Sequence, residues 1–160
     1  MANVIAVCGC KNSGKTTLIS RIVDELSREG LKVAVIKHDG HDFACDIPGT
    51  DTYTFIESGA YATVCFSDKR LFIHRVGTGD TLEGIITMFP EADLIIVEGC
   101  KDSSLPKIEV IRRAVSDSAV SNPEGRFLIA TDWPEGCFDE TQVSINDAEA
   151  IIKEIRRVCR

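Results

Sequence analysis

The amino-acid sequence predicts a three-layer α/β fold, in which a mostly parallel, twisted sheet has helices on both faces. Short apolar runs alternate along the chain with segments of helical periodicity, which favours a parallel sheet. A length of 160 residues fits one domain with its own core. A glycine-containing segment also joins the first predicted strand to the first predicted helix. We therefore expect residues 1–160 to form a single domain.

The first quarter of the chain shows the strand and helix alternation most clearly. Val4–Cys8 is an uninterrupted apolar run, as in a strand buried on both faces. A helix is predicted from about Lys15 to Gly30, where a glycine ends the pattern. Its apolar face consists of Leu18, Ile19, Ile22, Val23 and Leu26. Lys32–Ile36 is the next buried strand.

The middle of the chain is predicted to contain a hairpin between two helices. Asp51–Ala60 has the pattern of a short helix, and Ala62–Phe66 and Arg70–Ile73 are strands joined by a tight turn. Asp80 and Glu83 form a capping-box pair that opens the next helix. Its apolar face is Leu82, Ile85, Ile86 and Phe89, and Pro90 ends it.

The second half of the chain contains further apolar runs and a terminal helix. Strands are predicted at Asp93–Val97, Lys107–Ile111 and Phe127–Ala130, and a last helix begins near Asn146. Because parallel strands present their carboxyl ends at one edge, the polar segments that follow the strands are expected there. These segments are Gly9–Thr17, Lys37–Phe43, Glu98–Ser104 and Thr131–Glu135.

The segment "GCKNSGKTTL" matches the phosphate-binding pattern G-x-x-x-x-G-K-[ST]. Gly9 and Gly14 let the backbone approach phosphate oxygens, Lys15 reaches the β- and γ-phosphates, and the Thr16 hydroxyl binds magnesium. An apolar strand precedes the pattern and an amphipathic helix follows it, which is the context that this motif requires. The sequence therefore predicts a P-loop NTPase fold that binds a nucleotide. Lys11 is a second basic residue in the loop and a further candidate for contacting phosphate.

Two acidic positions are candidates for the metal ion and the attacking water. Glu98 ends the apolar strand "DLIIVE", where a P-loop enzyme needs a carboxylate for magnesium or its water. Asp39 follows the second strand and suits the same roles. We predict that Lys15, Asp39 and Glu98 are catalytic and that Thr16, Glu98 and Asp39 hold the metal; the sequence does not decide which carboxylate binds metal and which orients water.

The segment "IKHDGHDF" concentrates titratable side chains after the second strand. Lys37, His38 and His41 are candidates for substrate contacts beside Asp39. A cluster of histidine and aspartate also permits a transition-metal site, and the alternative to both is a polar surface loop.

Composition limits the classes of function. The net charge of -7 and the pI of about 5.0 argue against a dedicated nucleic-acid binder. We find no apolar run long enough to span a membrane and no signal peptide. The seven cysteines contain no C-x-x-C pair, which fits reduced thiols in the cytoplasm better than disulfides or a zinc site.

The motifs together resemble one family. "GCKNSGKTTL", "VIKHDGHDF", "PGTDTY", "SGA" and "IIVEGCKDSSLPKIEVIR" occur in the order and spacing of the molybdopterin-guanine dinucleotide biosynthesis protein B family, MobB. The resemblance covers residues 3 to about 112. It implies a P-loop GTP-binding protein with weak GTPase activity, usually a homodimer. Such a protein assists formation or delivery of the guanine dinucleotide form of molybdenum cofactor.

The resemblance also implies partners and site residues. The nucleotidyl transfer belongs to a separate MobA-type nucleotidyltransferase, and molybdoenzymes receive the cofactor. The residues that match the nucleotide loop are Gly9, Asn12, Ser13, Gly14, Lys15, Thr16 and Thr17. The later family motifs match Lys37, His38, Asp39, Glu98, Gly99, Lys101, Pro106, Lys107 and Glu109. If molybdopterin binds this chain, Lys101 and Lys107 are candidates for a cationic wall facing its phosphate.

The nucleotide base is the least determined part of the prediction. The guanine-binding pattern N-K-x-D does not occur in the sequence. Asp132 follows a predicted strand, where its carboxylate accepts hydrogen bonds from guanine or simply starts the turn at Pro134. GTP therefore rests chiefly on the resemblance.

Two other functions are compatible with the loop. A small-molecule kinase that uses ATP would need a lid rich in arginine, for which the candidates are Arg112, Arg113 and Arg126. A switch module would bind nucleotide without useful turnover. No arginine finger is evident in the sequence, so GTP hydrolysis by the GTPase that the resemblance implies is expected to be slow.

Overall fold

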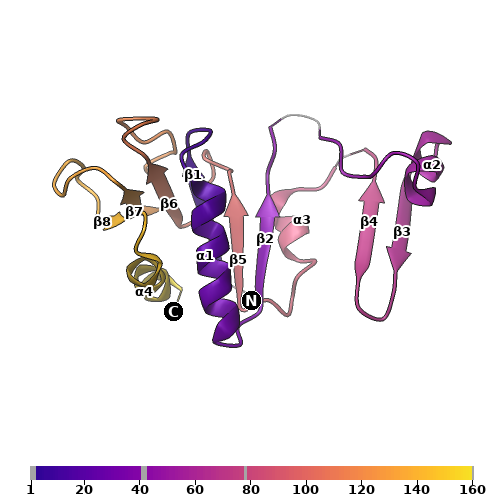
Figure 1. The fold of residues 1–160 in the computed structure, drawn as a ribbon, viewed down its shortest axis with the longest axis horizontal. Coiled ribbons are helices and arrows are strands. Elements are labelled where there is room, and N and C mark those ends of the chain that lie inside the picture. Colours follow the sequence, from indigo (N-terminus) through magenta and orange to yellow (C-terminus); the bar gives the residue numbers. More distant parts are fainter. Residues whose placement is uncertain (1–2, 41–42, 78, 160) are drawn as a thin grey trace. The chain divides into compact units, whose positions relative to one another are not determined.

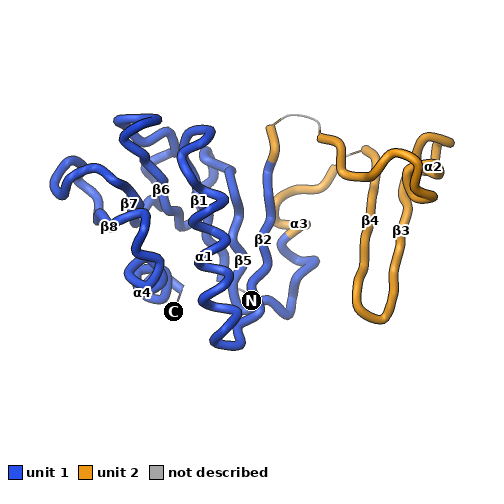
Figure 2. The backbone as a smooth tube through the Cα atoms, in the orientation of Figure 1, with its two compact units in different colours: residues 1–38, 86–160 blue, residues 39–85 orange. Residues whose placement is uncertain are grey.

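The structure, a computed structural model, describes residues 3–40, 43–77 and 79–159. The chain divides into two compact units, one made of residues 1–38 and 86–160 and the other of residues 39–85 (Figure 2). The first unit contains the large sheet, and the second contains a hairpin (Figure 1). The single nucleotide-binding domain over residues 1–160 stays a prediction.

A six-stranded parallel sheet forms the frame of the first unit. The strand order is β2-β5-β1-β6-β7-β8, and each neighbouring pair is parallel. The strands are β1 (Asn3–Gly9), β2 (Val33–Lys37), β5 (Leu94–Glu98), β6 (Lys107–Ile111), β7 (Arg126–Thr131) and β8 (Gln142–Ser144). The predicted α/β class with a mostly parallel sheet is confirmed, and β8 is an added strand of only three residues.

Two helices bury the apolar stripes that the sequence periodicity predicts. The helices α1 (Lys15–Arg28) and α4 (Ala148–Val158) pack together over one face of the sheet (Figure 1). Their buried side chains join those of the strands in one core, in which Ile5, Ile22, Ile96 and Ile151 are completely buried. The predicted start of α4 near Asn146 is two residues early, because Asp147 caps the helix by accepting from the N–H of Ala150 at 2.9 Å.

Connecting segments cover the opposite face of β6. Glu109 is buried on that face, and its Oε1 accepts a 2.8 Å hydrogen bond from the N–H of Val120. Lys107 lies two residues away on the same strand face and donates to carbonyl groups of the segments that precede and follow β6. Two buried charged residues therefore fix the segments that precede and follow this strand in the chain.

The second unit is built around an antiparallel hairpin. Strands β3 (Ala62–Phe66) and β4 (Leu71–Arg75) pair as predicted, and α2 (Asp51–Glu57) precedes them. The predicted capping of α3 (Leu82–Ile86) is wrong: Thr81 accepts from the N–H of Gly84, whereas Asp80 pairs with Arg75. The helix also ends at Ile86 and does not continue to Pro90.

Candidate nucleotide-binding site

The phosphate loop connects β1 to α1 through a backbone that requires glycine. Gly9 has φ of 139°, and a Cβ there would lie 2.4 Å from the carbonyl oxygen of Val110. Gly14 has φ of 100° and is the N-cap of α1. A side chain at Gly9 would collide with β6, so the first glycine of the motif lets the loop pass close to the sheet.

The N-terminus of α1 adjoins the loop and has no side-chain cap. Gly14 supplies no side-chain cap, and the first turn of the helix contains no acidic residue. The first N–H groups of a helix have no partners within the helix, and its dipole favours an anion at this end. With the glycine-containing loop ahead of it, this terminus has the geometry of a phosphate-binding site.

Lys15 folds back over the loop that precedes it. Its Nζ donates to the carbonyl oxygens of Gly9 at 3.0 Å and Cys10 at 2.7 Å. An ammonium group has three N–H donors, so one is left for a ligand in this arrangement. The side chain is thereby held at the loop, next to the backbone that the motif predicts to bind phosphate.

Thr16 and Glu98 meet across the site. The Thr16 hydroxyl lies 3.2 Å and 3.3 Å from the two carboxylate oxygens of Glu98, although the residues are 82 positions apart. One hydroxyl and one carboxylate are hard oxygen ligands of the kind that magnesium prefers, and the ion keeps several waters beside such ligands. The residues therefore fit the predicted magnesium ion.

Lys37 and His38 lie next to Glu98 at the end of β2. Lys37 is in register with Glu98, and the N–H of His38 donates to the Glu98 carbonyl oxygen at 3.0 Å. A Cβ at Gly99 would lie 3.1 Å from the carbonyl oxygen of His38. The structure thus brings these two predicted substrate residues to the side of the loop on which Thr16 contacts Glu98.

Asp39 belongs to the second compact unit, so its predicted catalytic and metal-binding roles stay predictions. His41 lies outside the described residues.

Lys107 is enclosed by protein, which corrects the prediction that it faces a ligand. Its side chain is completely buried, and Nζ donates to the carbonyl oxygens of Ser103, Asn122 and Glu124. All three of its N–H donors therefore have partners within the protein. Lys101, by contrast, is exposed and stays a candidate for a ligand contact.

Asp132 lies at the end of β7, as expected, and one of its oxygens is already engaged. Oδ1 accepts a 2.6 Å hydrogen bond from the backbone N–H of Arg113. The guanidinium of Arg113 lies over the ring of Trp133 at 5.3 Å from its centre. These contacts fix the turn after β7, and the role of Asp132 toward guanine stays a prediction.

Arg112 lies beside the phosphate loop. The sequence patterns indicate it only as a candidate for a kinase lid. A Cβ at Gly14 would lie 3.3 Å from Nη2 of Arg112. Arg112 directly follows β6, just as Glu98 ends β5. The rule that strand ends collect ligand-binding residues would have selected it.

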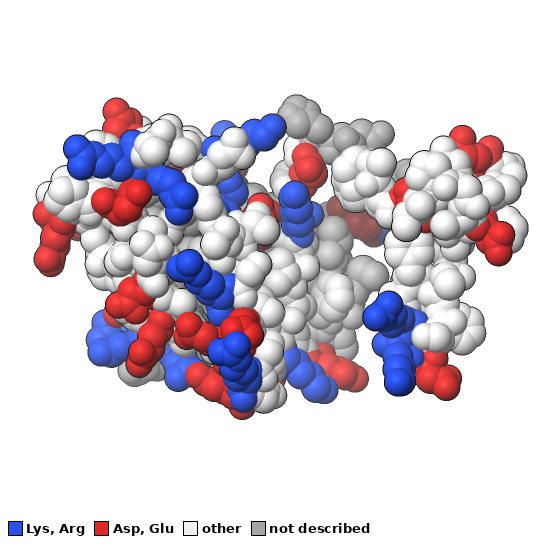
Figure 3. Space-filling view, viewed as in Figure 1, with Lys and Arg blue, Asp and Glu red and all other residues white. Residues whose placement is uncertain are grey.

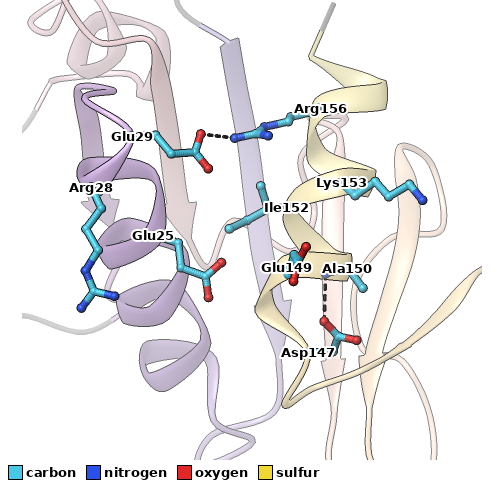
Figure 4. A pocket seen from close by; sticks show the side chains of 9 residues that line it. All are labelled: Glu25, Arg28, Glu29, Asp147, Glu149, Ala150, Ile152, Lys153 and Arg156. Atoms are coloured by element: carbon cyan, nitrogen blue, oxygen red, sulfur yellow. Dashed lines mark hydrogen bonds and ion pairs between the residues drawn. The ribbon is translucent and has the colours of Figure 1, made fainter.

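A groove between α1 and α4 lies toward the opposite end of α1 from the phosphate loop. Figure 4 shows that side chains of both signs line it, with an ion pair between Glu29 and Arg156. Positive and negative side chains are also interspersed on the face drawn in Figure 3. The ion pair links the two helices across the groove, and we assign the groove no ligand.

Residues 3–40, 43–77 and 79–159 contain no helix long and apolar enough to cross a membrane. The same residues contain no group of three or more His, Cys, Asp or Glu side chains arranged to hold a metal ion.

All seven cysteines are free thiols. Burial, together with the negative charge of Glu109, raises the pKa of the Cys8 thiol to about 12, and that thiol donates to the Gly99 carbonyl oxygen.

Comparison with known proteins decides the family. Residues 4–132 match the family described as Molybdopterin guanine dinucleotide synthesis protein B, MobB. The chain belongs to the MobB family. The MobB match begins in β1 and ends at Asp132, so it includes the phosphate loop, Glu98 and Arg112.

Individual MobB-like proteins agree with this assignment. The chain is 30% identical to the molybdopterin-guanine dinucleotide biosynthesis adapter protein of Haemophilus influenzae, over 89% of this chain and 82% of the relative. It is also 30% identical to the adapter protein of Escherichia coli, over 94% and 90%. The crystal structure of a MobB homologue from Bacillus stearothermophilus covers 97% of this chain and 99% of that one at 26% identity, with a TM-score of 0.73.

Proposed function

We propose that this protein is an adapter in the biosynthesis of molybdopterin guanine dinucleotide that binds GTP with magnesium and hydrolyses it slowly. Membership of the MobB family and similarity to proteins named as adapters support the pathway. One structural observation carries the nucleotide proposal. The glycine-dependent loop, the uncapped helix terminus and Lys15 converge on one place, beside the Thr16–Glu98 contact.

The proposed binding mode uses the backbone for phosphate and two side chains for the metal ion. N–H groups of residues 9–17 surround the phosphates, and Lys15 exchanges its carbonyl partners for phosphate oxygens. Thr16 and Glu98 hold magnesium directly or through its waters, with Asp39 as the further candidate. Magnesium bound there neutralises charge on the β- and γ-phosphates. Lys11, Asn12, Ser13 and Thr17 complete the loop.

Slow hydrolysis follows from the small set of groups available for it. Water attacks the γ-phosphorus and the bond to the β-phosphate oxygen breaks, while Lys15 stabilises charge on the phosphates. A carboxylate of Glu98 or Asp39 orients that water. Turnover without an arginine finger is slow in P-loop GTPases, which suits an adapter that uses the bound state itself.

The preference for GTP rests on the family and on the free oxygen of Asp132. Its Oδ1 is occupied by the Arg113 N–H, and we propose that Oδ2 accepts from N1 and N2 of guanine. Adenine presents an acceptor at N1 and would be repelled by that carboxylate. Asp132→Asn should therefore reduce the ratio of GTP to ATP affinity.

The pathway role also requires a second ligand and protein partners. We propose that the second ligand is molybdopterin. The residues proposed to contact it are Lys37, His38, His41 and Lys101. A MobA-type nucleotidyltransferase and the receiving molybdoenzymes are the proposed partners in the cytoplasm.

We also propose that the protein is a homodimer. One face of the β3–β4 hairpin carries the cross-strand pairs Val64–Ile73 and Phe66–Leu71, and all four side chains are exposed. A two-stranded hairpin is marginally stable by itself, so a second copy that covers these residues would stabilise it.

Release of phosphate under single-turnover conditions tests the proposed activity. With protein in excess over GTP and magnesium present, we expect slow, complete release of inorganic phosphate. Tight binding of GTP without release of phosphate would favour a switch module that binds nucleotide without hydrolysing it. Rapid transfer from ATP to a small molecule would instead support the kinase alternative and contradict the proposal.

A further inference from the structure

Arg112 is held against the phosphate loop by the turn that follows β6. Its carbonyl oxygen accepts from the N–H groups of Val115 at 2.8 Å and Ser116 at 2.9 Å. Its guanidinium packs on Gly14, where Nη2 and Cζ would lie 3.3 Å and 3.6 Å from an added Cβ. The backbone that carries the side chain is therefore fixed, and the cation lies next to the last loop residue before Lys15.

The guanidinium has no anion to pair with in the described structure. Nε of Arg112 is buried and has no hydrogen-bond partner. Among residues 3–40, 43–77 and 79–159, no carboxylate oxygen lies within 4.0 Å of the side chain. A partly buried cation without a counter-ion is unfavourable, and it is retained where a ligand supplies the negative charge.

We infer that the Arg112 guanidinium binds the α- or β-phosphate of the nucleotide. This inference rests on the proposed function of the loop. Loop N–H groups surround the α- and β-phosphates, whereas Lys15 reaches the β- and γ-phosphates. Arg112 contacts Gly14 and approaches the loop from β6, on the opposite side of β1 from Glu98 and β5. Its fork of donors then pairs with phosphate oxygens that GTP and GDP share.

This contact differs from an arginine finger in its effect. A finger acts on charge that develops during γ-phosphoryl transfer and raises kcat. A contact to the α- or β-phosphate is equally strong before and during the reaction, so it contributes to binding only. Arg112 is therefore predicted to determine affinity for GTP and GDP alike, with little effect on the rate of bound GTP hydrolysis.

Calorimetric titration of Arg112 variants with GTP and with GDP, each with magnesium, tests the inference. Arg112→Gln should weaken both nucleotides by a similar factor of about 10 to 100, because a charge-assisted hydrogen bond is lost. Arg112→Lys keeps the charge and should recover part of the affinity. Arg157→Gln removes an exposed cation on α4, away from the loop, and should change neither dissociation constant.

The outcomes separate this inference from the proposed function. If the unsubstituted protein binds GTP and Arg112→Gln binds it equally well, the inference is wrong and the proposed function stands. If Arg112→Lys is as weak as Arg112→Gln and both lower the melting temperature equally, Arg112 only supports the loop and the inference is also wrong. If the unsubstituted protein binds neither nucleotide, both fail.

Discussion

The hydroxyl of Thr16 lies 3.2 Å from a carboxylate oxygen of Glu98, and this contact joins the start of α1 to the end of β5. The parallel pairing of β1 with β5 produces it, because Val7 is in register with Glu98 and the loop that follows β1 returns to the same edge. Two residues that are distant in sequence thus form one oxygen-rich position beside the phosphate loop.

The Thr16–Glu98 contact predicts how nucleotide binding depends on magnesium. Glu98→Gln should reduce the gain in GTP affinity on adding magnesium by about 10- to 100-fold, as loss of a metal ligand or of its supporting group does. Affinity measured with the metal chelated should be unchanged. Titrations with GTP in magnesium and in EDTA measure both values. The exposed Glu91→Gln is the matched control, and an unchanged magnesium effect in Glu98→Gln would remove Glu98 from the metal site.

Lys15 is predicted to dominate the binding of phosphate. Lys15→Ala removes the ammonium group that the Gly9 and Cys10 carbonyl oxygens hold at the loop, and GTP should bind about 100-fold more weakly. Its melting temperature without nucleotide should stay close to that of the parent protein, since Lys15 is only partly buried. Lys153→Ala, on α4, controls for the lost charge. Tight GTP binding by Lys15→Ala would contradict the assignment of the phosphate loop.

Lys107 is predicted to stabilise the fold and not to bind a ligand. Lys107→Met removes a buried donor from three partly buried carbonyl groups and should lower the free energy of unfolding by about 3 kcal/mol. The exposed Lys101→Met should change it by less than about 0.5 kcal/mol. Urea denaturation measures both. Equal stability of the two variants would show that the buried hydrogen bonds of Lys107 are unimportant.

Cys8 is predicted to resist alkylation. Burial raises the pKa of its thiol to about 12, and the thiolate is the reactive form. At pH 8, iodoacetamide should modify the exposed Cys137 at least ~100-fold faster than Cys8, as peptide mass spectrometry would detect. Because the folded state holds this proton more tightly than the unfolded state, the contribution of Cys8 to stability should fall as pH rises from about 9 to about 12. Equal modification rates would show that Cys8 is accessible.

Local sequence patterns were sufficient for the sheet and the phosphate loop. Apolar runs such as Ile5–Cys8 are buried on both faces in a parallel sheet, and that burial leaves an unambiguous pattern. Gly9 and Gly14 could be predicted because their backbone conformations exclude most other residues. Glu98 was found because it ends such a run.

Packing partners were not predictable from the same patterns. The sequence places Lys107 in a strand, but only the fold shows that the connecting segments around β6 enclose its ammonium group. Arg112 was recognised as a basic residue, and its approach to Gly14 depends on β6 lying beside β1. Strand β8 has three residues and is too short for periodicity to detect.

The most direct test of the central claim is a calorimetric titration of the protein with GTP and with ATP, each in the presence of magnesium. We predict one nucleotide site per chain, with GTP bound tightly and ATP bound much more weakly. Tight binding of ATP with weak binding of GTP would contradict the proposed GTP-dependent adapter and favour a kinase. Binding of neither nucleotide would contradict the functional assignment of the loop at Gly9–Thr16.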